Sequence, residues 1–283
     1  MSAIWVLAQL TLREALRRKL VAAGAAVSVA LIGLSAWGFW KLSHNHTMTS
    51  GEVQIAIPQA FVLFMFMFSF VVALSASAIA SPAVSSEVES GVLQTVVTRP
   101  IRRSDVILGK WAGLAALLAA YSLLVTGVMA VVVHAVSGFA VPNVLAAAGF
   151  LFAEGAVLLT LVLLLSTRLS ALASGVIGVA LFGMAWLAGV VGSLGVAFHV
   201  PALHTASEVS MYVLPTDGLW HAVIYYLEPP TYVTQTLGGL AQSHGGNPFF
   251  AAAGPTWAYL VWAALWFVLV LSLGLVSFER REL

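Results

Sequence analysis

Glu154 is the residue of this sequence that could do acid–base or substrate-binding chemistry in apolar surroundings. It stands about ten residues into an apolar stretch, Val144–Ser166, which as a helix would place it near mid-bilayer. A carboxylate that faces lipid at that depth costs at least about 2.5–3.5 kcal/mol, so the side chain should face other helices or be protonated. Two interpretations stay open: a polar point on a substrate pathway, and a neutral acid hydrogen-bonded to a Ser or Thr of another helix.

Histidines could bind a metal ion or titrate near neutral pH. All seven map to, or near, what we expect to be the outer face: His44, His46, His134, His199, His204, His221 and His244. Only His44 and His46 are closely spaced, so we expect no metal site. The chain has no cysteine, which excludes disulfides and thiolate chemistry.

Motifs of membrane enzymes and nucleotidases do not occur in the sequence. There is no H-E-x-x-H pattern, and no histidine lies in the middle of an apolar stretch. The pair Gly109-Lys110 is not part of a phosphate-binding loop, because Ser104 and Trp111 stand where Gly and Ser or Thr are required. We therefore expect no catalytic residue and no cofactor bound by this chain.

The composition is that of an integral membrane protein. Hydrophobic residues make up 61% of the 283 residues and charged residues 8%, and the mean hydropathy is +1.01. A soluble domain carries roughly 25% charged residues. The net charge of +1 provides no basic field for nucleic acid. A water-soluble globule, a disordered chain and a nucleic-acid binder are therefore excluded.

Six apolar stretches reach the length of about 20 residues that a transmembrane helix needs. Lipid forces each to satisfy its own backbone, so we expect an all-α membrane protein with six transmembrane helices in a domain over residues 20–283. All but one of the 12 Lys and Arg residues lie on one face, which predicts both termini in the cytoplasm. The expected spans are Leu20–Trp40, Pro58–Val84, Trp111–Ser137, Val144–Ser166, Leu169–Phe198 and Thr256–Phe278.

Two segments outside these stretches have helical periodicity. Residues 1–19 form an amphipathic pattern, typical of a helix in the headgroup plane, which is either a simple anchor or an elbow that braces the first span. In the extracytoplasmic loop, residues 199–255, Asp217 can begin a helix whose apolar face rests on the outer leaflet or the span ends. Alternatively this helix is a lid or a docking site for an extracytoplasmic protein. Its face comprises Trp220, Val223, Ile224 and Leu227.

Small residues favour close helix contacts in lipid. The fifth span is rich in them, which predicts a tight contact there, either in a dimer seam together with the first span or within one subunit. Its glycines are Gly175, Gly178, Gly183, Gly189, Gly192 and Gly195.

The segment over residues 85–110 joins the second and third spans on the expected cytoplasmic side. Glu87 and Glu89 stand where a helix dipole favours acids, and Arg99-Pro100 would end such a helix. The segment is either a short amphipathic helix that acts as a lever or an ordinary solvated loop. The apolar face would comprise Val88, Val92, Leu93, Val96 and Val97.

This segment resembles the coupling segment of ABC transporter permeases of the type-2 exporter superfamily. The resemblance rests on three runs: Glu89-Ser-Gly91-Val-Leu93, then Thr98-Arg99-Pro100-Ile-Arg102-Arg103, then Ile107-Leu108-Gly109-Lys110. Val92 replaces a more common Thr. The C-terminal run Phe278–Leu283 is similar to the F-x-R-R-D-L ending of the family, with Glu282 for Asp. In layout the chain looks closest to the copper-enzyme maturation branch.

The resemblance implies the permease subunit of an ATP-driven exporter in the cytoplasmic membrane. It would pair with a second copy or a homologue, and a separate cytosolic ATPase would bind ATP and Mg²⁺. Membrane-embedded catalysis and ion-coupled transport through Glu154 are the alternatives, although the broken helices and inverted repeats of such carriers are not evident. The implied ATPase-coupling residues are Glu87, Glu89, Gly91, Leu93, Arg99, Pro100, Arg102 and Arg103.

Overall fold

The computed structural model describes residues 3–44, 48–89, 102–229, 247–251 and 253–280. These residues form helices joined by short connections and contain no strand. The helices are α1 (Ala3–Leu16), α2 (Lys19–Ser43), α3 (Ser50–Ala80), α4 (Pro82–Glu89), α6 (Arg103–Ser137), α7 (Val144–Ser166), α8 (Ala171–Ala197), α9 (Pro201–Val213), α10 (Thr216–Leu227) and α12 (Trp257–Glu279).

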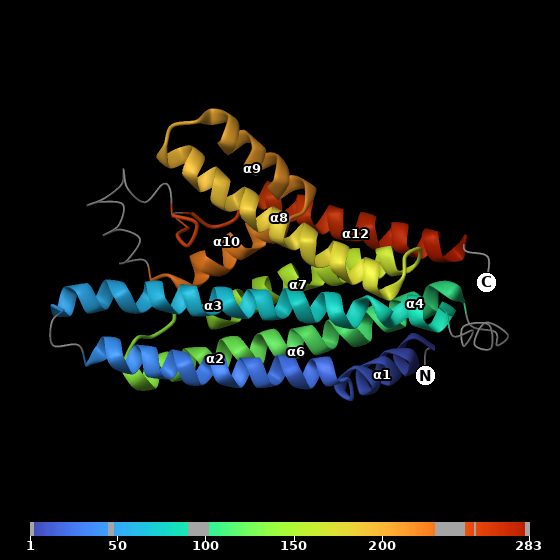
Figure 1. Ribbon diagram of the computed structural model, residues 1–283, viewed down its shortest axis with the longest axis horizontal. Helices are drawn as coiled ribbons and strands as arrows, with labels where there is room; N and C mark the ends of the chain where they lie inside the picture. Colours follow the sequence, from blue (N-terminus) through green and yellow to red (C-terminus); the bar gives the residue numbers. More distant parts are fainter. Residues whose placement is uncertain (1–2, 45–47, 90–101, 230–246, 252, 281–283) are drawn as a thin grey trace.

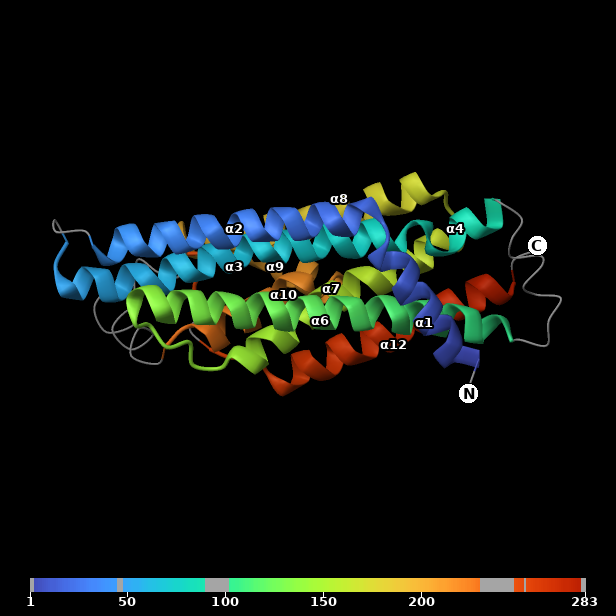
Figure 2. The same ribbon diagram turned by 90° about the horizontal axis from the view of Figure 1, so that it is seen from below.

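Six helical segments are long and apolar enough to cross a membrane: α2, α3 with α4, α6, α7, α8 and α12. The predicted all-α fold with six spans is confirmed, and α7 has the predicted bounds. The spans run along the long axis of the bundle, and both chain termini lie at one end of it, next to α1 and α4 (Figure 1, Figure 2). We call this the terminal end. The last turn of α2 and the first turn of α3 lie at the opposite end.

The second span begins eight residues before the predicted start at Pro58, because α3 starts at Ser50. Its first turn is fixed by a capping box, in which the Thr49 side chain accepts a hydrogen bond from the Glu52 N–H and the Glu52 carboxylate accepts one from the Thr49 N–H. Such reciprocal bonds satisfy two N–H groups that a helix start leaves unpaired. Two turns of mixed polar and apolar residues are therefore added to the apolar run, and Pro58 lies inside the helix.

The core of the bundle surrounds α7, which packs against α3, α6, α8, α10 and α12. Phe61, Phe68 and Met65 of α3 and Leu151 of α7 are fully buried there. By contrast, α2 and α12 expose large apolar side chains such as Val29 and Leu265. In a membrane protein this surface faces lipid or another subunit, so α3 and α7 form the centre and α2 and α12 the periphery.

After α8 the chain turns back, and α9 packs along α8 before α10 enters the bundle (Figure 1). α10 packs against α7, α8 and α3 and buries Trp220, Val223, Ile224 and Leu227, which is the predicted apolar face. The expectation that this helix rests on the outer leaflet or the span ends is wrong. Its opposite side is partly covered as well, since Gly218 and Ala222 are also buried.

The glycines of α8 serve contacts within this chain. An added Cβ would lie 2.2 Å from Val162 at Gly178, 2.4 Å from the Asp217 carboxyl at Gly189 and 2.3 Å from Ser207 at Gly192. The tight contact predicted for the fifth span is therefore present, with α7, α9 and α10 as neighbours. Of the two interpretations left open, the structure shows internal packing.

Glu228, directly after α10, makes stability depend on pH. Burial raises the pKa of its carboxyl from 4.5 to about 8, although a hydrogen bond from the Ala251 N–H acts in the opposite direction. Burial likewise raises the pKa of Asp217, and His221 opposes this. A Glu that is protonated when folded and ionised when unfolded takes up a proton on folding, so stability falls as pH rises from the unfolded to the folded pKa.

We therefore expect the melting temperature of the wild type to fall by several degrees more than that of Glu228→Gln between about pH 5 and about pH 8. Thermal unfolding in detergent across this range measures the difference. Glu208→Gln is the matched control, because the Glu208 side chain on α9 is 56% exposed. Equal pH dependence in the wild type and Glu228→Gln would contradict the burial argument.

Candidate functional site

The two ends of the predicted coupling segment lie at the terminal end of the bundle. Glu87 and Glu89 belong to the last turn of α4, Arg102 is the N-cap residue of α6 and Arg103 is its first residue. Gly91, Leu93, Arg99 and Pro100 lie outside the described residues, as does most of the predicted amphipathic helix. The structure thus places where the segment leaves and re-enters the bundle.

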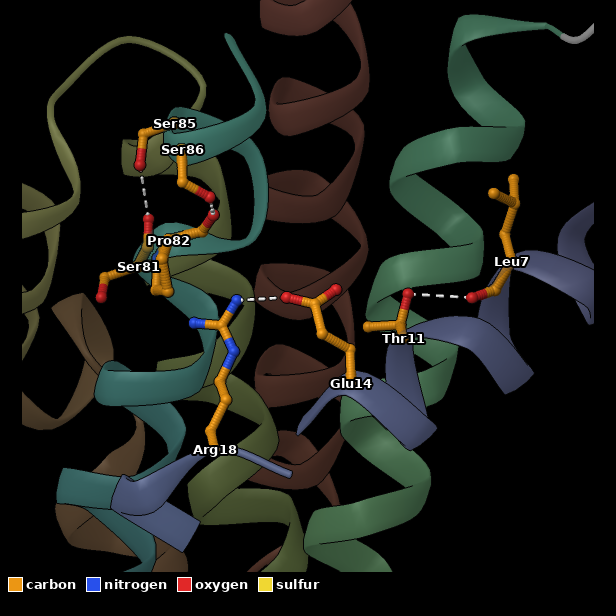
Figure 3. A network of polar contacts seen from close by, with 8 residues as sticks. All are labelled: Leu7, Thr11, Glu14, Arg18, Ser81, Pro82, Ser85 and Ser86. Atoms are coloured by element: carbon orange, nitrogen blue, oxygen red, sulfur yellow. Dashed lines mark hydrogen bonds and ion pairs between the residues drawn. The ribbon is translucent and has the colours of Figure 1, made fainter. Parts of the chain in front are cut away.

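The segment leaves from a kinked connection. Only Ser81 separates α3 from α4, and Pro82 lacks the N–H that would continue the helical hydrogen bonds. The Ser85 hydroxyl donates to the Ser81 carbonyl at 2.8 Å, and the Ser86 hydroxyl donates to the Pro82 carbonyl (Figure 3). α4 is therefore joined to α3 without a flexible loop between them.

A polar cavity of about 20 Å³ lies between α1, α4 and α6. Arg18 donates to Glu14 at 2.5 Å on one side, with Pro82 and Ser86 of α4 opposite (Figure 3). Lys110 of α6 lines the same cavity and is only 6% exposed. We call these residues, with Thr11, the α1–α4–α6 cluster. It places three charged side chains, Glu14, Arg18 and Lys110, beside α4, the helix from which the coupling segment begins.

α1 reaches this position because two glycines of α6 lie beneath it. An added Cβ at Gly109 would be 2.5 Å from Leu7, and one at Gly113 would be 2.5 Å from the Ala8 carbonyl oxygen. Without side chains there, the helix axes approach closely, as small residues spaced four apart allow. The amphipathic pattern predicted for residues 1–19 is present as a helix that buries Ala8 and Ala15 against the bundle.

The start of α6 and the α7–α8 connection both bind the end of α12. Arg103 donates to the Glu279 carbonyl at 3.3 Å, and Arg168 donates to the hydroxyl and the carbonyl of Ser277 at 3.0 and 3.1 Å. Displacement of Arg103 would therefore reach α12 as well as α6.

In the part of the chain that the structure describes, most basic residues belong to the helix ends and connections at the terminal end of the bundle, whereas Lys41 lies in the last turn of α2, whose end is at the opposite side of the bundle (Figure 1). The positive-inside rule associates such an asymmetry with the cytoplasmic side. The basic residues at the terminal end are Arg13, Arg17, Arg18, Lys19, Arg102, Arg103, Lys110, Arg168 and Arg280.

Glu154 lies far from this cluster, in the middle of α7. It is 2% exposed and accepts a hydrogen bond of 2.7 Å from the Ser69 hydroxyl of α3. The side chain therefore faces other helices, as expected, and Ser69 is the partner that the sequence did not identify. A role of Glu154 on a substrate pathway stays a prediction.

Other acids and histidines occur in pairs. His221 lies 3.6 Å from the Asp217 carboxylate, and His204 lies 3.9 Å from that of Glu208. Across the described ranges, no three His, Asp or Glu side chains are close enough to hold a metal ion together.

Sequence reasoning missed the buried Lys110 and the contact of α1 with α6. Two signals for them were present. Glu14 and Arg18 have the i, i+4 spacing of a helical ion pair, and Gly109 and Gly113 form a small-residue pair. Neither signal names its partner helix, which depends on the tertiary fold.

A family model described as "ABC-2 family transporter protein" matches residues 4–283. The match covers all six candidate spans, both ends of the coupling segment and all of α1 except its first residue. No curated protein matches the chain.

Proposed function

Because the chain belongs to the ABC-2 family of transporter proteins and is a permease subunit of an ABC transporter, we propose that it exports its substrate with energy from a separate ATPase. This ATPase binds ATP and Mg²⁺ and docks on residues 87–103 from the cytoplasm. A second copy or a homologue completes the translocation path. Both termini lie on the cytoplasmic side of the cytoplasmic membrane.

One observation carries this proposal: the coupling segment leaves α4 and enters α6 at the end of the bundle that holds the basic residues. A partner that binds there contacts two spans through rigid connections. α4 transmits a displacement to α3 through the Pro82 kink, and Arg102-Arg103 transmit it to α6 directly.

The same displacement has two further routes. The α1–α4–α6 cluster connects α4 and α6 to α1. Only Arg17 and Arg18 separate α1 from the first span, α2. The hydrogen bond from Arg103 to the Glu279 carbonyl connects the start of α6 to α12. Closure of the ATPase can thus displace α1, α3, α6 and α12 together, which is the kind of rigid-body change that alternating access requires.

The decisive experiment is affinity purification of the full chain in mild detergent, followed by identification of co-purifying ATP-binding proteins. We expect Glu89→Ala and Arg102→Ala to reduce ATPase retention, or the ATP hydrolysis of the complex, by about tenfold, as loss of a charge-assisted contact of about 1.4 kcal/mol would do. Glu208→Ala and Lys41→Ala are the matched controls, since both residues are exposed and far from the segment.

Membrane insertion should be unchanged in all four variants, which a protease-protection assay can check. Full ATPase retention and full hydrolysis in both Glu89→Ala and Arg102→Ala would overturn the proposed docking segment. Because the chain has no cysteine, a single cysteine placed in the coupling segment also tests sidedness with an impermeant reagent. Labelling from the outside would overturn the orientation.

A further inference from the structure

A small cavity lies where α10 meets α3, α7 and α8. Its walls include Ser69 of α3, Glu154 of α7 and Thr216, Asp217 and Trp220 of α10. Aromatic rings close the remaining sides. The cavity is therefore polar on two sides and lies where α10 enters the bundle.

Two polar atoms of these walls are buried without a hydrogen-bond partner among the described residues. One is the second carboxyl oxygen of Glu154, Oε2, and the other is the indole nitrogen of Trp220, Nε1. Both side chains are 2% exposed. Leaving a buried donor or acceptor unsatisfied costs about 1–3 kcal/mol each, so native proteins almost always provide a partner.

We propose that one ordered water molecule occupies this cavity and bridges Glu154 Oε2 and Trp220 Nε1. The volume open to the centre of a water molecule is about 10 Å³, close to the roughly 10–15 Å³ on this measure that a single buried water needs. The water accepts from the indole N–H and donates to the carboxyl oxygen. The side-chain oxygens of Thr216 and Asp217 supply the further partners that buried waters usually have.

The same chemistry distinguishes water from a cation. An indole N–H only donates, so it cannot ligate a metal ion, and its partial positive charge repels one. A water molecule is both donor and acceptor, which is the combination that one unpaired donor and one unpaired acceptor require. The bridge extends the hydrogen bond from Ser69 to Glu154 into a chain that joins α3, α7 and α10. The water thus holds α10 in its buried position.

The direct test is a density map of the full chain in lipid nanodiscs, at a resolution that shows ordered water. We expect one peak within hydrogen-bond distance of both atoms in the wild type. Trp220→Phe keeps a ring beside Phe66, 5.5 Å between centroids, but removes the N–H, and the peak should disappear or move. Trp186→Phe is the matched control, because Trp186 lines the same cavity but its ring is not fully buried, and the peak should remain.

Thermal unfolding gives a second readout that needs no map. Trp220→Phe and Glu154→Gln should each lower the melting temperature by about 2–4 °C, and the double variant by clearly less than the sum, since both changes break one bridge. Strict additivity would overturn the proposal. So would an empty cavity in the map, a direct contact between the two side chains, or a peak that appears only with a particular cation.

Discussion

Gly113→Val should detach α1 from α6 and lower the apparent melting temperature by several degrees, on the order of 4–8 °C. An added Cβ would lie 2.5 Å from the Ala8 carbonyl oxygen and 3.1 Å from Thr11 Cβ. A backbone carbonyl cannot rotate away as a side chain can, so α1 itself must move. Overpacking of this kind costs about 1–3 kcal/mol.

Gly127→Val is the matched control, because Gly127 lies on the same helix and nothing approaches its Cβ position within 4 Å. Both changes add the same side chain to α6, so their difference reports the contact with α1. The movement can be measured directly in this cysteine-free chain. Leu12 and Ala116 line the groove between α1 and α6, and Leu12→Cys with Ala116→Cys should crosslink efficiently with Gly127→Val but poorly with Gly113→Val.

The proposed function gives this variant a second consequence. Displacement of α1 separates Glu14 and Arg18 from Lys110 and so opens the α1–α4–α6 cluster. We expect the ATPase to bind the variant permease as before, because residues 87–103 are unchanged. The rate of ATP hydrolysis should then depend less on whether the permease is bound. Equal melting temperatures and equal crosslinking in Gly113→Val and Gly127→Val would contradict the close packing of α1 on α6.

Hydropathy was sufficient to find the spans because lipid imposes length and apolarity on each helix separately. The predicted bounds of the last three spans differ from those of α7, α8 and α12 by at most two residues. The second and third spans begin eight residues earlier than predicted, at Ser50 and Arg103. A capping box begins α3, and the polar first turns of α6 carry Arg103, Asp105 and Lys110, which no apolar window includes.

Positions that depend on two helices at once were not predictable from the sequence. The prediction of the apolar face of α10 is confirmed. A 12-residue helix with one apolar face, however, fits a leaflet surface as well as a bundle interior. Similarly, the inward orientation of Glu154 followed from the cost of a charge in lipid, whereas its contact with Ser69 depends on the pairing of α3 with α7. The free-energy cost of a charge in lipid thus predicts that a residue avoids lipid, whereas the pairing of helices determines which side chain it contacts.

The second large effect is expected at the junction of α8 with α10. An added Cβ at Gly189 would lie 2.4 and 2.5 Å from the two carboxyl oxygens of Asp217, whose side chain is 8% exposed. Gly189→Val should therefore push Asp217, and with it the start of α10, out of place. We expect the melting temperature to fall by roughly 2–4 °C, less than in Gly113→Val, because a side chain can rotate where a backbone carbonyl cannot.

Gly183→Val is the control on the same helix, since no atom lies within 4 Å of its Cβ position. Asp217→Ala tests the cause, because it removes the atoms that the new side chain would meet. If the Asp217 carboxyl is the obstacle, the loss of melting temperature in the double variant Gly189→Val with Asp217→Ala should be much smaller than the sum of the losses in the two single variants. A double-mutant cycle measures this coupling. If the two effects simply add, Gly189 is required for a reason other than the space that Asp217 occupies, and α10 is not held by this contact.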